Sequence, residues 1–215
     1  MKDFVSIYKK IKMQAPEHHF EFRDPFWVLI TTILSQRTKD NVTDASARAL
    51  YNRYHDAAGL AMAKPEDVKK IIKNVGFSNV KSKRVIDAAK YILKNYNGNV
   101  PDTYEELMKI KGVGTKTANI VLTQSFNKPA IPVDTHVHRI VNRIGFVNTR
   151  TPEETETELK KIIPLEYQIE FNPVLVEFGK NICKPVSPKC DMCLVRDCCD
   201  YYSRKSINNV KANKA

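Results

Sequence analysis

Apolar residues recur along most of this chain at intervals of three and four residues, the spacing that places side chains on one face of an α-helix. Helix-start signals precede several of these runs, as where Asp24 and Pro25 lead into the apolar stretch FWVLITTIL. The expected core-facing stripes are Val42, Ala45, Ala49 and Leu50; Val68, Ile71, Ile72 and Val75; Val85, Ala89, Ile92, Leu93 and Tyr96; Ala118, Val121 and Leu122; and Val137, Ile140, Val141 and Ile144. Convincing strand-like alternation is missing, so the sequence predicts an all-α fold.

The excess of basic residues indicates that this helical protein has a polyanionic partner. The 215 residues include 35 lysines and arginines against 24 acids, a formal net charge of +11. Such a surplus favours nucleic acid or an anionic membrane as partner, and the alternative is a protein kept soluble by its charge. No apolar run approaches the roughly 20 residues of a membrane span, and the first residues do not form a signal peptide. We expect a cytoplasmic, nucleoid-associated protein with no membrane partner.

All five cysteines fall between residues 183 and 199, in the segment CKPVSPKCDMCLVRDCC. This clustering argues against disulfides spread through a secreted fold and favours a metal site, because thiolates are soft ligands. Zinc and a [4Fe-4S] cluster both accept four thiolates. A single CxxC pair within one short loop favours the iron-sulfur cluster, and the residues alone leave zinc open.

A glycine turn lies between two helical patterns in KIKGVGTKTANIVL, residues 109–122. Gly112 and Gly114 allow a tight turn, and the backbone amides at the start of the following helix would form a site for a phosphate. Two glycines alone are a weak signal, since they are typical of many turns. Lys116 stands in the first turn of that helix, either as a phosphate-binding lysine or as a nucleophile.

Four motifs together resemble the endonuclease III family of DNA glycosylases, within the helix-hairpin-helix superfamily. They are LSQRTKD, LMKIKGVGTKTANIVL, VDTHVHRI and the spacing C-x6-C-x2-C-x5-C, in the family's order over about residues 20–200. The resemblance implies a six-helix barrel with the hairpin over residues 22–130. It also implies a discontinuous iron-sulfur domain from residues 1–21 and 131–215, the two flanking a DNA-binding cleft. A monomer is expected, and the family's usual hairpin proline is Lys111 here.

The resemblance also assigns the cysteines. It implies a structural [4Fe-4S] cluster whose loop is held against DNA by a basic surface that includes Lys184 and Lys189. Cys198 is then the spare cysteine, with a shift of register between neighbouring cysteines as the alternative. The implied ligands are Cys183, Cys190, Cys193 and Cys199.

The same resemblance implies the chemistry. Lys116 matches the lysine that attacks C1′ of a damaged nucleoside, and Asp134 matches the assisting aspartate, although a helix N-cap is the alternative role for Asp134. A helix N-terminus and partial burial are expected to lower the pKa of the Lys116 amine, which makes it a better nucleophile. The implied activity is a bifunctional glycosylase and AP lyase that acts on double-stranded DNA with a damaged base or abasic site, removing oxidised pyrimidines such as thymine glycol.

Extrusion of the damaged nucleotide requires side chains that fill the gap. Phe77 matches the family's apolar wedge, with a core aromatic as the alternative, and either Gln36 or Arg37 faces the orphaned base. The expected DNA contacts are Gly112, Gly114, Lys111, Gln36, Arg37, Phe77, Lys81, His136, Lys184 and Lys189. Two other functions stay open: a non-enzymatic DNA-binding or redox-sensing iron-sulfur protein, and a mismatch uracil or thymine glycosylase, although relatives limited to base removal lack the lysine.

Overall fold

The computed structural model describes residues 2–204, and within this range it contains α-helices and two short 3₁₀ helices but no β-strand. The all-α prediction is confirmed for these residues. The chain divides into two compact units: a contiguous unit, Phe20–Ala130, and a discontinuous unit, Met1–His19 with Ile131–Ala215. The sequence predicted that the contiguous domain begins at residue 22. The assignment of each unit as a separate domain stays a prediction.

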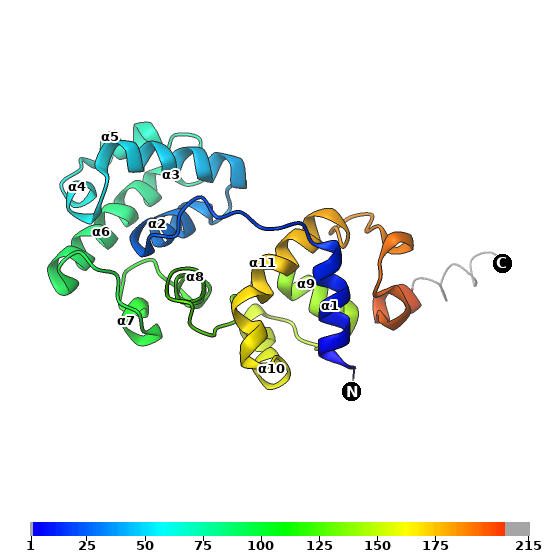
Figure 1. Ribbon diagram of the computed structural model, residues 1–215. Coiled ribbons are helices and arrows are strands. Elements are labelled where there is room, and N and C mark those ends of the chain that lie inside the picture. Colours follow the sequence, from blue (N-terminus) through cyan, green and yellow to red (C-terminus); the bar gives the residue numbers. More distant parts are fainter. Residues whose placement is uncertain (1, 205–215) are drawn as a thin grey trace. The chain divides into compact units, whose positions relative to one another are not determined.

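The contiguous unit is built around α2 (Figure 1). Its helices are α2 (Pro25–Ser35), α3 (Asp40–Tyr54), α4 (Ala57–Ala61), α5 (Pro65–Ile71), α6 (Ser78–Tyr96), α7 (Tyr104–Met108) and α8 (Thr115–Phe126). The predicted start of α2 is confirmed, because the Asp24 carboxylate accepts the Trp27 N–H at 3.0 Å and Pro25 opens the helix. From Phe26 to Ile30 every side chain is buried, as expected of a helix packed on several sides by α3, α6 and α8.

The predicted face of α3 is wrong by part of a turn. The helix buries Thr43, Ser46, Ala47 and Leu50, whereas Ala45 and Ala49 are exposed. Small and hydroxyl-bearing side chains fit closely against neighbouring helices, so the buried stripe of α3 does not coincide with its most apolar residues. The stripes expected in the later helices are buried, apart from Leu93 at 39% exposure and the half-buried Ile71 and Tyr96.

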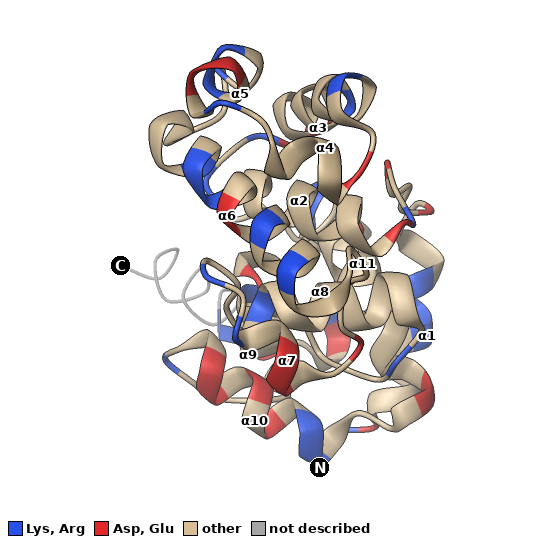
Figure 2. Cartoon of the chain, turned by 90° about the vertical axis from the view of Figure 1, so that its left-hand side faces the viewer, with Lys and Arg blue, Asp and Glu red and all other residues tan. Residues whose placement is uncertain are grey.

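The discontinuous unit has its own core, to which the first residues of the chain contribute. Its helices are α1 (Phe4–Gln14), α9 (Thr135–Ile144), α10 (Pro152–Ile162), α11 (Leu165–Asn181) and the 3₁₀ turns η1 (Cys190–Met192) and η2 (Arg196–Cys198). Phe4 and Tyr8 of α1 stack at 5.5 Å between ring centroids, and both rings pack against Phe171 of α11. Acidic residues gather on α10, as Figure 2 shows.

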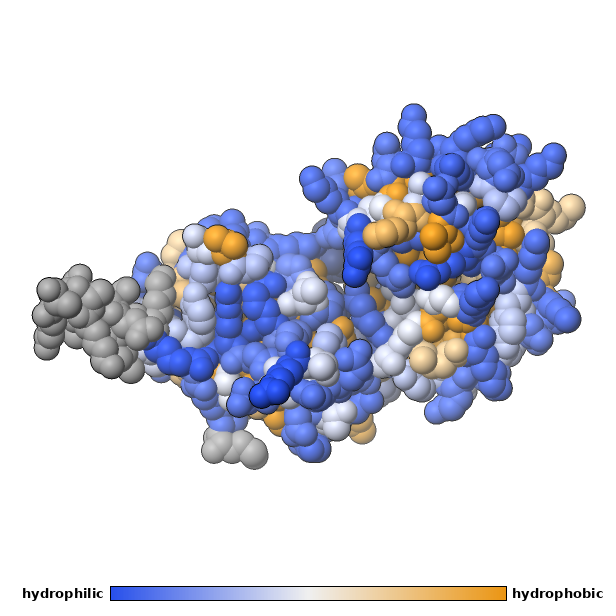
Figure 3. Space-filling model, turned by 180° about the vertical axis from the view of Figure 1, so that it is seen from behind, coloured by the Kyte–Doolittle hydropathy of each residue, from blue (hydrophilic) through white to orange (hydrophobic). Residues whose placement is uncertain are grey.

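No described helix combines the length and the apolar character that crossing a membrane requires. Hydrophobic side chains reach the surface as small separate patches on the face seen in Figure 3. Phe77, at 62%, is among the more exposed large apolar residues of the described chain.

Candidate active site and cysteine loop

The hairpin between α7 and α8 is shaped by two glycines with different roles. Gly112 has a left-handed backbone, with φ of 91°, and a Cβ there would lie 3.4 Å from Cδ of Arg84. Gly114 is the N-cap of α8 in an extended conformation, and a Cβ there would meet nothing within 4 Å. Gly112 is therefore required by the turn itself, whereas Gly114 leaves open space in front of the helix.

The open end of α8 presents unused hydrogen-bond donors. No side chain caps its first turn, and the Thr115 hydroxyl is instead paired with the Tyr104 hydroxyl at 2.9 Å. The first amides of a helix have no partner within the helix, and together with its dipole they attract an anion. Lys116, the second residue of α8, is half-buried and is the only lysine or arginine in that helix.

A second group of predicted residues meets elsewhere in the contiguous unit. One pocket is lined by Gln36, Arg37, Phe77, Val80, Lys81 and Arg84. Phe77 is 62% exposed, which rules out the alternative of a core aromatic. The Arg37 guanidinium carbon lies 5.8 Å from the centroid of the Phe77 ring, and both residues have left-handed backbones, with φ of 53° and 59°. Positive φ at two bulky residues is uncommon and often marks a functional segment.

Lys81 is not available for the phosphate contact expected from the sequence. Its residue is 2% exposed, and its ammonium donates to Leu34 O at 2.6 Å, Gln36 O at 2.5 Å and Thr38 Oγ1 at 3.0 Å. An ammonium group has three protons, and each of them has an acceptor here. Burial, and then the charge of Arg84, lower the pKa of Lys81 to about 8. The sequence missed this because a lysine in a basic segment reads as a surface residue.

Asp134 begins α9 in the discontinuous unit. Its Oδ1 accepts the N–H of His136 at 2.9 Å and the N–H of Val137 at 2.8 Å. The N-cap alternative named from the sequence is thus an observed role of this carboxylate. The two bonds hold the side chain in one orientation, and they occupy only one of its oxygens.

The turn after Asp134 packs directly on α11. A Cβ at Gly179 would come within 2.5 Å of Nδ1 of His136 and 2.9 Å of Nη2 of Arg139, so only glycine accommodates these side chains. Arg139 Nη2 lies 3.3 Å from His136 Nδ1 and donates to the carbonyl of Cys183 at 2.9 Å. Burial lowers the pKa of Arg139, partly offset by nearby anionic groups such as Cys183 and Asp134. His136 is thus held from two sides, within a turn anchored to the cysteine loop.

The cysteine loop separates one cysteine from the other four. Cys183, Cys190, Cys193 and Cys199 line a single cavity together with residues that include Lys189 and Arg143. Cys198 does not line it, and its thiol donates to Val195 O at 3.2 Å. Burial raises the pKa of Cys193 to about 11 and raises that of Cys199. Buried thiolates require compensating positive charge, and Arg143 Nη1 lies 3.6 Å from Cys183 Sγ.

The number of thiols around this cavity fits the four thiolates that a [4Fe-4S] cluster requires, and it fits four-coordinate zinc as well. Within residues 2–204, no group of three or more histidine, cysteine, aspartate or glutamate side chains is placed so that it could hold a single metal ion.

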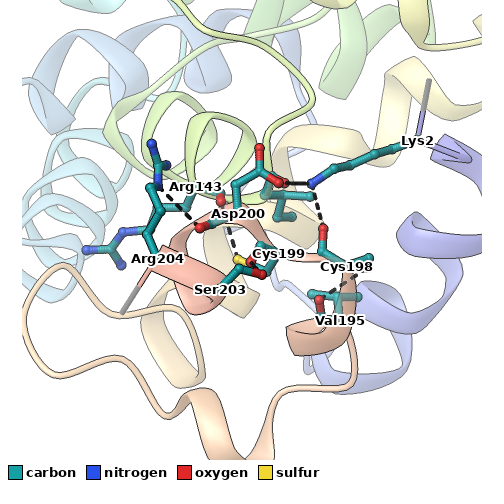
Figure 4. A network of polar contacts seen from close by, with 9 residues as sticks. Lys2, Arg143, Val195, Cys198, Cys199, Asp200, Ser203 and Arg204 are labelled. Atoms are coloured by element: carbon teal, nitrogen blue, oxygen red, sulfur yellow. Dashed lines mark hydrogen bonds and ion pairs between the residues drawn. The ribbon is translucent and has the colours of Figure 1, made fainter. Parts of the chain in front are cut away.

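Contacts from Arg143 of α9 and from Lys2 hold the C-terminal end of this loop (Figure 4), and Arg143 also bonds near its start. Arg143 donates to Lys184 O at 2.7 Å and stacks 4.5 Å from the Tyr201 ring centroid, while its own carbonyl accepts the Cys199 thiol at 3.3 Å. Lys2 donates to Cys198 O at 2.6 Å and pairs with Asp200 at 2.5 Å. Lys184 is half-buried and Lys189 is exposed.

Comparison with known proteins agrees with this architecture. Residues 30–165 match the model of the HhH-GPD superfamily base excision DNA repair proteins. Endonuclease III of Thermotoga maritima is 47% identical over 205 residues, which cover 95% of this chain and 96% of that protein. Endonuclease III of Escherichia coli K12 is 33% identical, covering 89% of this chain and 91% of that protein.

The chain belongs to the endonuclease III family of the HhH-GPD superfamily. The resemblance stated from the motifs is confirmed, and the chain is a base excision repair enzyme, a DNA glycosylase with AP lyase activity. A solved structure described as a trapped endonuclease III–DNA covalent intermediate matches with a TM-score of 0.87 and 32% identity, covering 96% of this chain and all of that one. A thermostable thymine-DNA glycosylase matches with a TM-score of 0.83 and 26% identity, covering 93% of this chain and 96% of that one.

Sequence reasoning missed the arginines and glycines that support these groups. Arg139 and Arg143 stand four residues apart in α9, a spacing that places both on one face, and this signal was present in the sequence. Gly179 and Lys2 gave no such signal, because their partners lie about 40 residues or more away along the chain.

Proposed function

We propose that this enzyme removes oxidised pyrimidines such as thymine glycol from duplex DNA through a covalent imine on Lys116. The observation that carries the proposal is the position of Lys116 in the first turn of α8, behind a helix end with uncapped amides. Those amides and the open space at Gly114 suit a DNA phosphate beside the target nucleotide. A phosphate held there would bring C1′ of its nucleoside near the amine of the same turn.

The reaction follows from the amine. The neutral Lys116 amine attacks C1′, the bond to the damaged base breaks, and the base departs with a proton. Opening of the sugar gives an imine between Lys116 and C1′. The imine makes the C2′ proton acidic, its removal breaks the C3′–O bond, and the strand is cut on the 3′ side. A relative solved as a trapped covalent DNA intermediate supports this route. The chemistry uses only the lysine and proton acceptors.

Asp134 is the proton acceptor that we propose for these steps. Its cap uses Oδ1, which leaves Oδ2 for a proton from the attacking amine or for the positive charge that develops on the sugar. The two backbone bonds fix the carboxylate before the substrate arrives, and this preorganisation lowers the cost of orienting it. The sequence predicted both roles for Asp134, and they are compatible.

Four cysteines of the loop would hold the [4Fe-4S] cluster: Cys183, Cys190, Cys193 and Cys199. Bound there, the cluster would supply a rigid centre for the loop, with Arg143 beside the thiolate of Cys183, and would take no part in the steps at C1′. Lys189, exposed beside the cavity, would then lie on the loop surface that meets DNA phosphates. The donor set and the separation of Cys198 support this assignment.

Trapping with borohydride tests the proposal. Wild type and Lys116→Ala would be incubated with a duplex that holds one thymine glycol, and with a duplex that holds one abasic site. Reduction of the imine should give a covalent protein–DNA band with the wild type and none with Lys116→Ala. Lys90→Ala, an exposed change on α6, is the matched control and should still give the band. A wild type that forms no band on either duplex would remove the imine route.

A further inference from the structure

Buried Lys81 connects the end of α2 to the start of α6. The last carbonyls of a helix lack partners within the helix, and a cation near that end is favourable. Lys81 Nζ satisfies Leu34 O within α2 and Gln36 O at its C-cap, and it reaches Thr38 Oγ1 beyond. Thr38 Oγ1 in turn accepts the N–H of Gly76 at 3.2 Å. One ammonium therefore fixes residues 34–38 against the residue that precedes Phe77.

The segment held in this way carries the two exposed side chains of the pocket. Arg37 lies between the two anchor points, Gln36 and Thr38, and Phe77 follows Gly76. A Cβ at Gly76 would come within 2.7 Å of Arg37 O, so the two backbones are in close contact. The left-handed conformations of Arg37 and Phe77 place their side chains together, with the guanidinium over the ring. The hydrogen bonds of the Lys81 ammonium go to two backbone carbonyls and to Thr38, so its effect on the Arg37 and Phe77 side chains passes through the backbone.

We propose that Lys81 is a positioning residue for nucleotide extrusion, which holds Arg37 and Phe77 as a preformed pair that enters the DNA stack. The inference rests on the proposed function for the role of the pair, and adds the residue that sets its geometry. A wedge that is already ordered loses little conformational freedom on entering DNA, so more of its contact with the bases is available to offset the cost of unstacking them. Loss of the ammonium would remove one donor from each of its three acceptors, leaving Thr38 Oγ1 with the Gly76 N–H alone, and would loosen the segment.

The test compares a reaction that requires extrusion of a nucleotide with one that does not. Excision of thymine glycol from a duplex requires extrusion, whereas cleavage of an abasic site in single-stranded DNA has no opposite base and no stack to restore. Lys81→Met keeps the length of the side chain and removes its donors. It should lower excision from duplex DNA at least tenfold and make the rate independent of the opposite base. Cleavage of single-stranded abasic DNA should stay within threefold of wild type. Lys90→Met, exposed on the same helix, should change neither rate.

A milder variant covers the case in which Lys81→Met does not fold. Thr38→Val keeps the shape of its side chain and removes one acceptor of Lys81 together with the bond to Gly76. It should lower duplex excision about threefold or more without changing single-stranded cleavage. Extrusion itself is read by 2-aminopurine beside the lesion, in a Lys116→Ala background where no bond is broken. The fluorescence rise on binding should shrink with Thr38→Val.

The outcomes distinguish this inference from the proposed function. A wild type unable to cleave abasic DNA would refute the lysine mechanism and leave the fluorescence test of Lys81 standing. Equal losses on duplex and single-stranded DNA in folded Lys81→Met would show a general structural role and overturn the positioning role. Wild-type excision and fluorescence in Thr38→Val would overturn it as well.

Discussion

Arg139, in the second turn of α9, donates through Nη2 to the backbone carbonyl of Cys183 at 2.9 Å. This bond joins the helix that begins at Asp134 to the first cysteine of the loop. The same guanidinium also reaches Gly179 O at 3.3 Å and Thr135 O at 3.3 Å. The start of α9, the end of α11 and the cysteine loop are therefore fixed by a single side chain.

Replacement of that side chain should destabilise the loop. We expect Arg139→Met to lower the free energy of unfolding by about 2 kcal/mol, since bonds from a charged donor to part-buried carbonyls are lost. Iron should also be released faster to a chelator, because the carbonyl of Cys183 is no longer held. Thermal unfolding and iron content over time measure the two effects. Arg150→Met, at an exposed position after α9, is the control. Unchanged iron release in Arg139→Met would contradict the anchoring role.

The two hairpin glycines should respond differently to the same substitution. Gly112→Ala places a Cβ on a left-handed residue and should cost about 1–2 kcal/mol of stability. Gly114→Ala meets no atom of the protein and should cost less than about 1 kcal/mol. Its methyl group would instead occupy the space of the bound phosphate and weaken binding to undamaged duplex. Thermal unfolding and fluorescence anisotropy give the two readings, and equal DNA affinity in Gly114→Ala and wild type would place the phosphate elsewhere.

Substitutions of Asp134 can separate its role as the N-cap of α9 from its proposed role in catalysis. Asparagine keeps an oxygen that can accept the His136 and Val137 amides, so Asp134→Asn should retain the stability of wild type within about 0.5 kcal/mol. Its excision rate should fall by about a hundredfold or more, because the proton acceptor is gone. Asp134→Ala should lose about 1 kcal/mol of stability as well. Single-turnover kinetics and thermal unfolding of both variants check this, and normal excision by Asp134→Asn would leave the residue with its cap role alone.

Local signals in the sequence predicted the helices better than their faces. Asp24 and Pro25 located the start of α2, since capping depends on neighbouring residues only. The face of α3 depends on which neighbours it meets, and there Ser46 is buried while Ala45 and Ala49 are exposed. A hydrophobic period cannot decide between alanines and small polar residues of similar size.

In the candidate site, too, features within one short segment were predicted better than contacts between distant residues. The hairpin glycines and Lys116 lie within one short segment, so the sequence specified their arrangement closely. Cys198 and Cys199 are adjacent, and only the folded loop turns one of them toward the cavity. The burial of Lys81 depends on carbonyls about 45 residues earlier, and nothing near it in the sequence indicates them.

The choice between Gln36 and Arg37 leads to a prediction on the opposite base. Arg37 is exposed and stacked on Phe77, whereas Gln36 is half-buried and its carbonyl is held by Lys81. A guanidinium pairs well with the two acceptors of guanine, and a good bidentate pair is worth about 1–3 kcal/mol. Wild type should therefore excise best opposite guanine. Arg37→Gln should lose about tenfold of that preference and shift toward adenine, measured with each of the four opposite bases. A loss of preference in Gln36→Ala and none in Arg37→Gln would reverse the assignment.

The lowered pKa of Lys81 predicts that this preference depends on pH. Burial, and then Arg84, bring the pKa to about 8, below its ordinary value of 10.5. Above pH 8 the neutral amine donates only two hydrogens and turns a lone pair toward an acceptor, so the segment with Arg37 loosens. The ratio of excision rates opposite guanine and adenine should fall as the pH rises from 7 to 9. Taking a ratio removes any effect of pH on the chemical steps that is equal for both substrates.

The titration of Lys81 should affect the free energy of unfolding in the opposite direction, raising it as the pH rises. Between about pH 8 and 10.5, Lys81 is mostly neutral in the folded chain and mostly protonated in the unfolded chain. The free energy of unfolding then rises with pH in that window, as far as Lys81 determines it. The titration of Lys81 therefore does not itself unfold the protein at high pH, and thermal unfolding at each pH checks that the enzyme is folded where the preference falls. The other charged side chains of the pocket are the guanidinium groups of Arg37 and Arg84. Lys81→Met should show a low ratio that is flat across this range, and a slope equal to that of wild type would assign the pH dependence to another group.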